Sequence, residues 1–276
     1  MTYVSVKLMG GLGNQLFEIF TTLAYALKYD LEFKFQDSDI LTIGIHHRPT
    51  YWNTLLSELK PFLVPVHTLT NNIYNEWTFR YIELPVFKES TTLFGYYQSY
   101  KYFENHIDII MQLLSINAQI ISIKKQFAYL FDSSKEVVSM HFRITGYREI
   151  EHCHPVAKYE YYINALRNFK DARILYLCQP EDQEEVNLII EKLKNEFPLF
   201  DFIKIPNELQ DWQQMLLTAC CNSNIIANSS FSWWGAYFGQ TINNNAGRVY
   251  YPLKWFGPGL NKDISDMSPP TWIGIN

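Results

Sequence analysis

Short apolar runs alternate with amphipathic stretches from residue 137 to the carboxyl terminus of the chain. The apolar runs have the length of buried strands, and the stretches between them repeat apolar positions with the 3.6-residue period of a helix. The predicted strands are 137–143, 173–178, 202–205, 224–227 and 248–251. The predicted helices are 158–169, 181–196, 212–221 and 231–240. This alternation indicates right-handed βαβ units and a parallel, doubly wound α/β sheet.

The first half of the chain carries the same pattern less regularly. A strand at 3–9 is followed by a helix at 16–29 and a second strand at 31–35. Residues 43–81 are irregular and predict a variable wall of a binding cleft, although a poorly patterned insertion fits as well. We expect Trp272 to add to that wall.

A strand at 91–94 and helices at about 107–114 and 118–131 complete the first half. The polar run at 132–135 then predicts a boundary between two domains, 1–134 and 135–276. A chain of 276 residues is comfortable for two domains of this size.

Polar side chains follow each predicted strand of the second half. Because the carboxyl ends of parallel strands meet at one edge of a sheet, and ligands of open α/β sheets bind there, these residues predict one polar crevice. They are His141, Arg143, Gln179, Glu181, Asn207, Asn228, Ser229, Ser230 and Lys254.

Arg143 is the strongest candidate of this set. Its planar guanidinium suits phosphate oxygens, and its charge can offset the negative charge that grows on a departing nucleotide diphosphate. The open alternative is an Arg143 paired with a buried carboxylate and a His141 hydrogen-bonded within the core.

Two helix starts offer backbone amides to an anion. In the first half, Gly10, Gly11 and Gly13 let the main chain approach a ligand closely, and Asn14 joins the helix amides there. A plain tight turn is the alternative, and the third glycine of a dinucleotide fingerprint is missing.

In the second half, Ser229, Ser230 and the amides from Phe231 onward form the other predicted cradle. Ser229 as a simple helix cap remains an alternative.

Composition narrows the function classes. A net charge of −5 argues against a nucleic-acid binder, because phosphate backbones require a basic face. We find neither a signal-peptide pattern nor a long apolar run, and we therefore expect a soluble, unanchored, cytoplasmic chain without a membrane span. The four cysteines lack metal-ligand spacing, which indicates reduced, structural thiols.

Acidic residues give little sign of a metal. Asp37 and Asp39 follow a predicted strand, yet two carboxylates are more typical of a solvated turn than of a divalent-cation site. His152, Cys153 and His154 lack a second cluster and are more typical of a solvated loop. We therefore expect no metal and no cofactor.

Several motifs resemble the α1,2-fucosyltransferases, the eleventh family of glycosyltransferases. GGLGNQLF from Gly10 and NSSFSWWGAYF from Asn228 carry the resemblance most specifically. GYYQSYKYF from Gly95, KYEYYINAL from Lys158 and the run from Asp211 to Ala236 fall between them in the same order. The similarity covers nearly the whole chain.

The resemblance implies a GT-B arrangement of two Rossmann-like domains facing across a cleft. The acceptor would lie on the side of 1–134 and the nucleotide sugar on the side of 135–276. Family members of this kind transfer L-fucose from GDP-fucose with inversion and without a metal, here in α1,2 linkage to a galactose-type acceptor of a glycan. Arg143 and the Ser229–Ser230 region would then hold the diphosphate, and Asn14 would face the sugar.

The donor motifs depart from the family pattern. The family's H-x-R-R-G-D-Y reads His141-Phe142-Arg143-Ile144-Thr145-Gly146-Tyr147 here, and its F-S-D-D is replaced by Cys178-Gln179-Pro180-Glu181. Arg148, Lys254 and Arg248 are candidates for a compensating cation. These changes leave two alternatives open, a different nucleotide sugar on the same fold, or a glycan- or nucleotide-binding protein without turnover.

The candidate catalytic residues are thus Arg143, Asn14 and His141. The candidate donor-binding residues are Gly11, Gly13, Arg143, Gln179, Glu181, Asn228, Ser229, Ser230 and Phe231. The general base is unassigned. Glu18 and Asp37 are possible by position, although each fits an ordinary surface or capping acid better. We expect an oxocarbenium-like transition state, as in glycoside hydrolysis.

Overall fold

The computed structural model describes residues 2–42, 47–244 and 246–276, and its internal contacts divide the chain into two compact units. The first comprises Met1–Ala118 with Asp263–Pro269, and the second comprises Gln119–Lys262 with Pro270–Asn276. The division falls inside α3 (Ile116–Gln126), whereas the polar run at 132–135 lies just before the second sheet.

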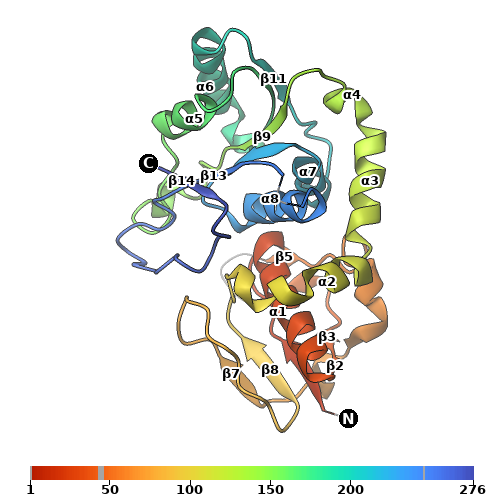
Figure 1. Ribbon diagram of the computed structural model, residues 1–276. Coiled ribbons are helices and arrows are strands. Elements are labelled where there is room, and N and C mark those ends of the chain that lie inside the picture. The colour runs from red at the N-terminus through yellow and green to blue at the C-terminus, as the bar shows by residue number, and fades with distance from the viewer. Residues whose placement is uncertain (1, 43–46, 245) are drawn as a thin grey trace. The chain divides into compact units, whose positions relative to one another are not determined.

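The first unit contains a four-stranded parallel sheet in the order β2-β1-β8-β7 (Figure 1). Its strands are β1 (Tyr3–Val6), β2 (Glu32–Phe33), β7 (Ile73–Asn75) and β8 (Thr91–Phe94). Helix α1 (Leu12–Tyr29) connects β1 to β2 as a βαβ unit. Residues 12–26 of this helix are buried except Asn14, and the apolar positions among them follow the helical period of the sequence.

The predicted strand at 31–35 is split in two. Its first part is β2, and its second part, β3 (Phe35–Gln36), pairs with β6 (Leu63–Val64) in a separate two-stranded sheet. Phe35 is fully buried with its ring 5.7 Å from that of Trp52, so packing draws this residue away from β1.

Short elements fill the remainder of the first unit. They are β4 (Ile40–Leu41), β5 (Arg48–Pro49), η1 (Ser57–Phe62), η2 (Val66–Thr68), η3 (Tyr100–Tyr102), η4 (Glu104–His106) and α2 (Ile107–Leu113). The described residues of 43–81 form only short strands and short 3-10 helices, as the irregular sequence pattern predicts. Residues 43–46 of that stretch lie outside the described residues.

Asp266 ties the segment 263–269 to the rest of the first unit. Its carboxylate pairs with Lys101 and, at 3.3 Å, with Arg80, and its carbonyl accepts a hydrogen bond from the Ser99 hydroxyl. Burial alone would raise the pKa of Asp266, but the hydrogen bonds from Lys101 and Arg80, together with their charges, leave this pKa below its ordinary value.

The second unit contains a six-stranded parallel sheet in the order β11-β10-β9-β12-β13-β14. Its strands are β9 (Val137–His141), β10 (Arg173–Leu177), β11 (Asp201–Lys204), β12 (Ser223–Ile225), β13 (Val249–Pro252) and β14 (Ile273–Ile275). The predicted parallel α/β sheet is confirmed, and β14 is an addition to it.

Helices cover both faces of this sheet. Figure 1 shows α5 and α6 on one side and α7 and α8 on the other. The helices of the second unit that follow α3 are α4 (Ala128–Phe131), η5 (Arg148–Ile150), α5 (Tyr159–Leu166), η6 (Pro180–Asp182), α6 (Gln183–Glu196), α7 (Asp211–Ala219) and α8 (Ser230–Ile242). The predicted helix at 118–131 is thus divided between α3 and α4.

Two glycines let α7 and α8 approach closely. A Cβ at Gly235 would lie 2.1 Å from the Thr218 hydroxyl, and one at Gly239 would lie 2.8 Å from the Ala219 carbonyl. Trp233 of α8 is fully buried, and its ring centre lies 5.3 Å from that of Trp272. Trp272 is only 6% exposed, so its predicted place in a cleft wall is wrong and it belongs to the core of the second unit.

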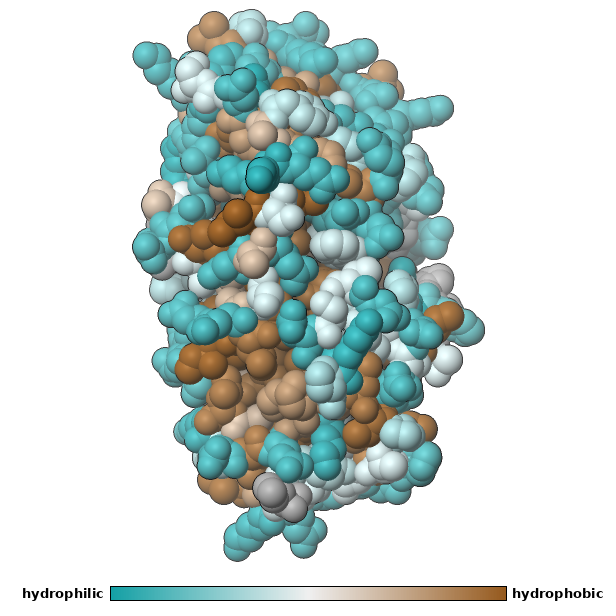
Figure 2. All heavy atoms as spheres, turned by 90° about the vertical axis from the view of Figure 1, so that its right-hand side faces the viewer, coloured by the Kyte–Doolittle hydropathy of each residue, from teal (hydrophilic) through white to brown (hydrophobic). Residues whose placement is uncertain are grey.

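No single helix of the described residues is both long and apolar enough to cross a membrane. The pair Glu104–Leu113 and Ile116–Gln126, bent by 64°, passes the same test of length and composition together. Ile109 and Ile121 are exposed on these helices, and Figure 2 shows apolar and polar spheres side by side over one face of the molecule.

Candidate functional site

The residues that follow the parallel strands of the second unit lie along one edge of its sheet. Strands β9, β10, β11, β12 and β13 all run in the same direction, and β9 and β12 are neighbours. The loops that carry Arg143 and Asn228 therefore start side by side.

Asp182 fixes the loop that follows β9. Its two carboxylate oxygens accept hydrogen bonds from the backbone amides of Ile144 at 3.0 Å and Thr145 at 2.8 Å. Asp182 ends η6, directly after the neighbouring strand β10, and is only 2% exposed. A carboxylate that accepts two amide bonds holds the backbone beside Arg143 in one position.

Arg143 lies half-buried at the start of this loop with its charge available. Its guanidinium carbon is 5.1 Å from the centre of the Tyr147 ring, within the range of a cation–π contact. Within residues 2–42, 47–244 and 246–276, no carboxylate lies close enough to Arg143 for an ion pair. The alternative of a structural Arg143–carboxylate pair therefore fails for the described part of the chain.

Gly146 leaves space beside the Arg143 guanidinium. Its φ is +78°, and a Cβ built there would lie 3.7 Å from an Arg143 guanidinium nitrogen. A side chain at this position would approach the guanidinium, and the sequence supplies none.

Tyr147 connects Arg143 to the start of α8. The Tyr147 hydroxyl donates to the Asn228 carbonyl at 3.1 Å and also contacts the Ser229 side chain. On its other side the ring stacks on His154, with centres 5.0 Å apart and planes 27° apart.

His141 is the last residue of β9 and is 7% exposed. Burial lowers its pKa to about 3, and the charge of Arg143 acts in the same direction. Its ring lies 5.4 Å from that of Phe231, and its buried Nδ1 has no hydrogen-bond partner among the described residues. His141 is therefore a neutral imidazole near pH 7 with a polar atom to spare.

Asn228 joins three loops with one amide. Its Nδ2 donates to the Pro155 carbonyl at 2.9 Å and to the Trp255 carbonyl at 3.0 Å, while its buried Oδ1 finds no partner in the described part of the chain. The Asn228 Nδ2 atom therefore holds the loops together, and the Oδ1 atom is the one available to a ligand.

Helix α8 begins immediately beyond Asn228. Ser229 occupies the cap position without a side-chain cap bond, and the first helical bond runs from the Trp233 amide to the Ser229 carbonyl at 3.0 Å. The first amides of a helix have no carbonyl partner within the helix and carry its positive dipole end. The start of α8 is thus suited to an anion, beside the Tyr147 hydroxyl.

Two further donor candidates, Gln179 and Glu181, follow strand β10. Gln179 is half-buried and Glu181 is exposed, on either side of Pro180 at the start of η6. Among the described residues, neither side chain forms a hydrogen bond or an ion pair with Arg143. Asp182, one position further on, is the acid that joins this segment to the Arg143 loop.

Two of the three candidate compensating cations are already engaged. Nη2 of Arg148 donates to both carboxylate oxygens of Glu185, at 2.9 and 2.8 Å. Arg248 pairs with Glu136 at 2.8 Å and lies over the Phe169 ring. Lys254 is exposed.

In the first unit, the glycine-rich turn is shorter than predicted. Helix α1 begins at Leu12 rather than at residue 16, so Gly13 is a buried helical residue and not a loop residue. Gly10 has a φ of +72°, and a Cβ there would meet the Asn14 side chain at 2.5 Å. Gly11 caps the helix with open space around it.

Asn14 is held at the opening of α1. Its Oδ1 accepts a hydrogen bond from the Gln98 side chain at 2.8 Å. Gln15 donates to the Gly10 and Pro49 carbonyls, which fixes the turn further.

Glu18 corrects a prediction. It is fully buried, rather than a surface or capping acid, and its Oε2 accepts a hydrogen bond from the Met9 amide at 2.9 Å. Burial raises the pKa of Glu18 well above its ordinary value, against the effect of the Met9 amide. Asp37, the other position considered for a base, is exposed.

The described residues contain no group of three His, Cys, Asp or Glu side chains placed to hold a metal ion. The four cysteines form no disulfide, and burial raises the pKa of Cys178 to about 11.

Comparison with known proteins places the chain in a class. The structure of an Arabidopsis thaliana FUT1 variant in complex with GDP matches 97% of this chain and 74% of its own, at 10% identity and a TM-score of 0.51. This likeness concerns the fold, which is that of a GT-B-type α/β protein with parallel sheets.

The chain belongs to glycosyl transferase family 11, whose model matches residues 3–275. The O-antigen biosynthesis glycosyltransferase WbnK of Escherichia coli is 27% identical over 201 residues, which are 68% of this chain and 62% of that protein. The match thus spans less than two thirds of WbnK. The alpha-1,2-colitosyltransferase of Escherichia coli is 25% identical over 300 aligned positions that cover 100% of this chain and 99% of the relative.

Proposed function

We propose that this chain is an inverting glycosyltransferase that transfers L-fucose from GDP-fucose, in α1,2 linkage, to a galactose-type acceptor of a glycan. The observation that supports it most is Arg143, a half-buried guanidinium with no ion-pair carboxylate in the described residues, at the ligand-binding edge of a parallel sheet. Membership of family 11 supplies the reaction class.

The chemistry requires a positive site for the leaving group. The acceptor hydroxyl oxygen attacks the anomeric carbon from the face opposite the diphosphate, and the bond from that carbon to the phosphate oxygen breaks. The hydroxyl proton passes to a general base that is unassigned. The electron pair of the broken bond goes to GDP, so negative charge grows on the terminal phosphate in an oxocarbenium-like transition state. Arg143 and the first amides of α8 would stabilise that charge.

Each neighbour of Arg143 has a part in this proposal. Tyr147 and Asp182 orient the guanidinium and its loop, while Ser229, Ser230 and Phe231 begin the helix that faces the phosphates. His141 is neutral and contributes a hydrogen bond rather than a charge. A charged hydrogen bond from the Arg143 guanidinium to a phosphate oxygen contributes about 1.5–3 kcal/mol.

The first unit is assigned the sugar and acceptor side. Gly11 leaves space beside the backbone, and Asn14 stands at the opening of α1. The reaction as proposed uses no metal ion, and its general base stays unassigned because Glu18 is buried.

A second candidate keeps the reaction and changes the sugar. Ile144, where the family pattern has a second arginine, is 4% exposed in the core of the second unit, so this chain binds its donor with one arginine fewer in the motif. The full-length similarity to an alpha-1,2-colitosyltransferase favours a colitosyl donor as that second candidate.

A donor panel tests both candidates. Purified protein is incubated with GDP-, UDP- and dTDP-linked sugars, GDP-fucose and GDP-colitose included, and with galactose-terminated acceptors, while nucleotide release and product mass are followed. Transfer from GDP-fucose supports the first candidate, and transfer from GDP-colitose alone supports the second. Nucleotide binding without any turnover would assign the chain to the non-catalytic binding class instead.

Variants connect the result to the site. Arg143→Ala should lower transfer by at least about tenfold, because one charged phosphate contact is lost. Arg167→Ala is the matched control, since Arg167 is exposed and its ion pair among the described residues is with Glu196 of the same unit.

A further inference from the structure

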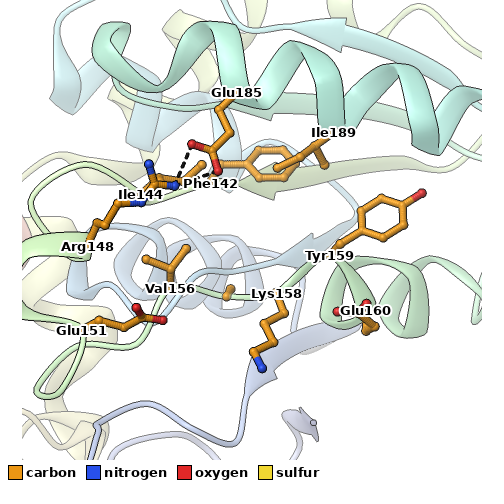
Figure 3. Close-up of a pocket in the computed structure, with 11 residues that line it drawn as sticks. Phe142, Ile144, Arg148, Glu151, Val156, Lys158, Tyr159, Glu160, Glu185 and Ile189 are labelled. Carbon is orange, nitrogen blue, oxygen red and sulfur yellow. Dashed lines mark hydrogen bonds and ion pairs between the residues drawn. The ribbon is translucent and has the colours of Figure 1, made fainter.

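A pocket of about 490 Å³ opens on the second unit between the loop after β9, the start of α5 and the first turns of α6 (Figure 3). Its size is that of a site for a small molecule. Arg148 lies at one end of the pocket and Tyr159 at the other in Figure 3.

This pocket is separate from the Arg143 group. Phe142 and Ile144 form its inner wall and are 1% and 4% exposed, and they alternate along the chain with His141 and Arg143. Successive side chains of an extended segment point to opposite faces, so the pocket lies on the other face of the loop. None of the predicted donor-binding residues lines it.

The rim of the pocket is charged in both senses. Arg148 and Glu185 form an ion pair at 2.8 Å across the upper edge, and Glu151, Lys158 and Glu160 stand around the remainder. Three acidic and two cationic side chains leave a small negative balance. A nucleotide diphosphate or another anion is therefore disfavoured here.

The walls of the pocket are apolar, in contrast to its charged rim. Val156 and Ile189 are half-buried and face it, and Tyr159 adds an aromatic ring. Tyr159 is half-buried at the first position of α5. An aromatic wall with hydrogen-bonding groups around it suits a ligand with one apolar face and a polar edge.

We propose that this pocket is a binding subsite for a neutral carbohydrate. The C–H face of a pyranose packs on Tyr159 and the aliphatic wall, its hydroxyls donate to Glu151 and Glu160, and Lys158 donates to its ring or hydroxyl oxygens. An uncharged, polyhydroxylated ring fits these demands together, while an acidic sugar meets the carboxylates of the rim. The subsite does not depend on the proposed transfer reaction.

The test uses the whole chain and sugars of known structure. Maltose, cellobiose and lactose are titrated separately while the amide resonances of Ala157, Lys158 and Glu160 are followed by NMR, in the presence of saturating GDP. At least one disaccharide should shift these resonances in a saturable way. Glucuronate should bind more weakly than the neutral sugars.

Two variants and one control locate the binding. Tyr159→Ala should weaken the responding sugar by about fivefold or more, which is the scale of one aromatic contact. Glu151→Gln, a change to an exposed side chain, serves as the second variant. Tyr129→Ala, on an exposed ring that does not line the pocket, should leave the affinity unchanged.

Absence of any saturable shift with the three sugars would overturn the proposal, as would an affinity that neither Tyr159→Ala nor Glu151→Gln changes. A saturable shift that appears without GDP and is lost when GDP saturates the protein would also overturn it, because the sugar would then occupy the nucleotide site.

Discussion

The Arg143 guanidinium lies 5.1 Å from the centre of the Tyr147 ring, and the hydroxyl of that same ring donates to the Asn228 carbonyl at 3.1 Å. One side chain therefore supports the charge on the β9 loop and fastens that loop to the start of α8. The two anion-binding features of the second unit, a guanidinium and a helix start, are held in register by Tyr147.

Tyr147→Phe removes the hydroxyl and keeps the ring under Arg143. We expect the KM for the sugar nucleotide to rise about three- to tenfold, because one hydrogen bond that positions the α8 side is lost. Steady-state kinetics with the active donor measures it, with Tyr129→Phe as control. An unchanged KM would show that the bond between Tyr147 and Asn228 does not position the site.

Asp182→Ala leaves the buried amide of Ile144 and the partly buried amide of Thr145 without these acceptors. The free energy of unfolding should fall by about 1–3 kcal/mol, mainly through the buried Ile144 amide, and turnover should fall further as Arg143 loses its fixed position. Denaturant unfolding and kinetics measure the two effects.

Asp182→Asn is the informative companion, since its single oxygen restores one of the two bonds. Its stability and activity should lie between those of the wild type and Asp182→Ala, and the exposed neighbour variant Glu181→Ala should resemble the wild type in stability. Equal stability and equal activity of all three variants would show that Asp182 does not fix the Arg143 loop.

Gly146→Asp should place a carboxylate beside Arg143. The Cβ position lies 3.7 Å from the guanidinium, so the new carboxylate competes with an anionic ligand, and GDP should bind several-fold more weakly. Gly146→Asn is the matched control, because it has the same shape and the same tolerance of a positive φ without the charge. Calorimetric titration of GDP into both variants decides, and equal affinities would show that Arg143 does not meet the nucleotide.

Glu18→Gln tests the buried acid of the first unit. The folded-state pKa of Glu18 is raised above the unfolded value of about 4.3, so its contribution to stability is fully present below that pH and is lost as the pH rises toward the raised value. Gln keeps an oxygen for the Met9 amide without titrating. The stability of Glu18→Gln relative to the wild type should increase from pH 5 to pH 8, and denaturant unfolding at several pH values measures it. A constant difference would mean that Glu18 titrates normally.

Local pattern predicted the second sheet well. Apolar runs and helical periods located β9 through β13 and the helices between them, because both faces of this sheet are covered and each element is amphipathic or apolar accordingly. The same reasoning brought His141, Arg143, Asn228 and Ser229 to one edge.

Contacts between distant residues escaped that reasoning. The bonds from Asp182 to the Arg143 loop span 37 and 38 positions, and no spacing rule connects them. The glycine-rich turn hid the start of α1, because glycines are typical of turns and loops, and nothing in the local sequence indicated that Glu18 would be buried.

The structure of the protein with GDP bound tests the central claim most directly. We predict a phosphate oxygen within hydrogen-bond distance of the Arg143 guanidinium, and the diphosphate beside the first amides of α8. A diphosphate bound elsewhere, with Arg143 still free of phosphate contacts, would contradict the account.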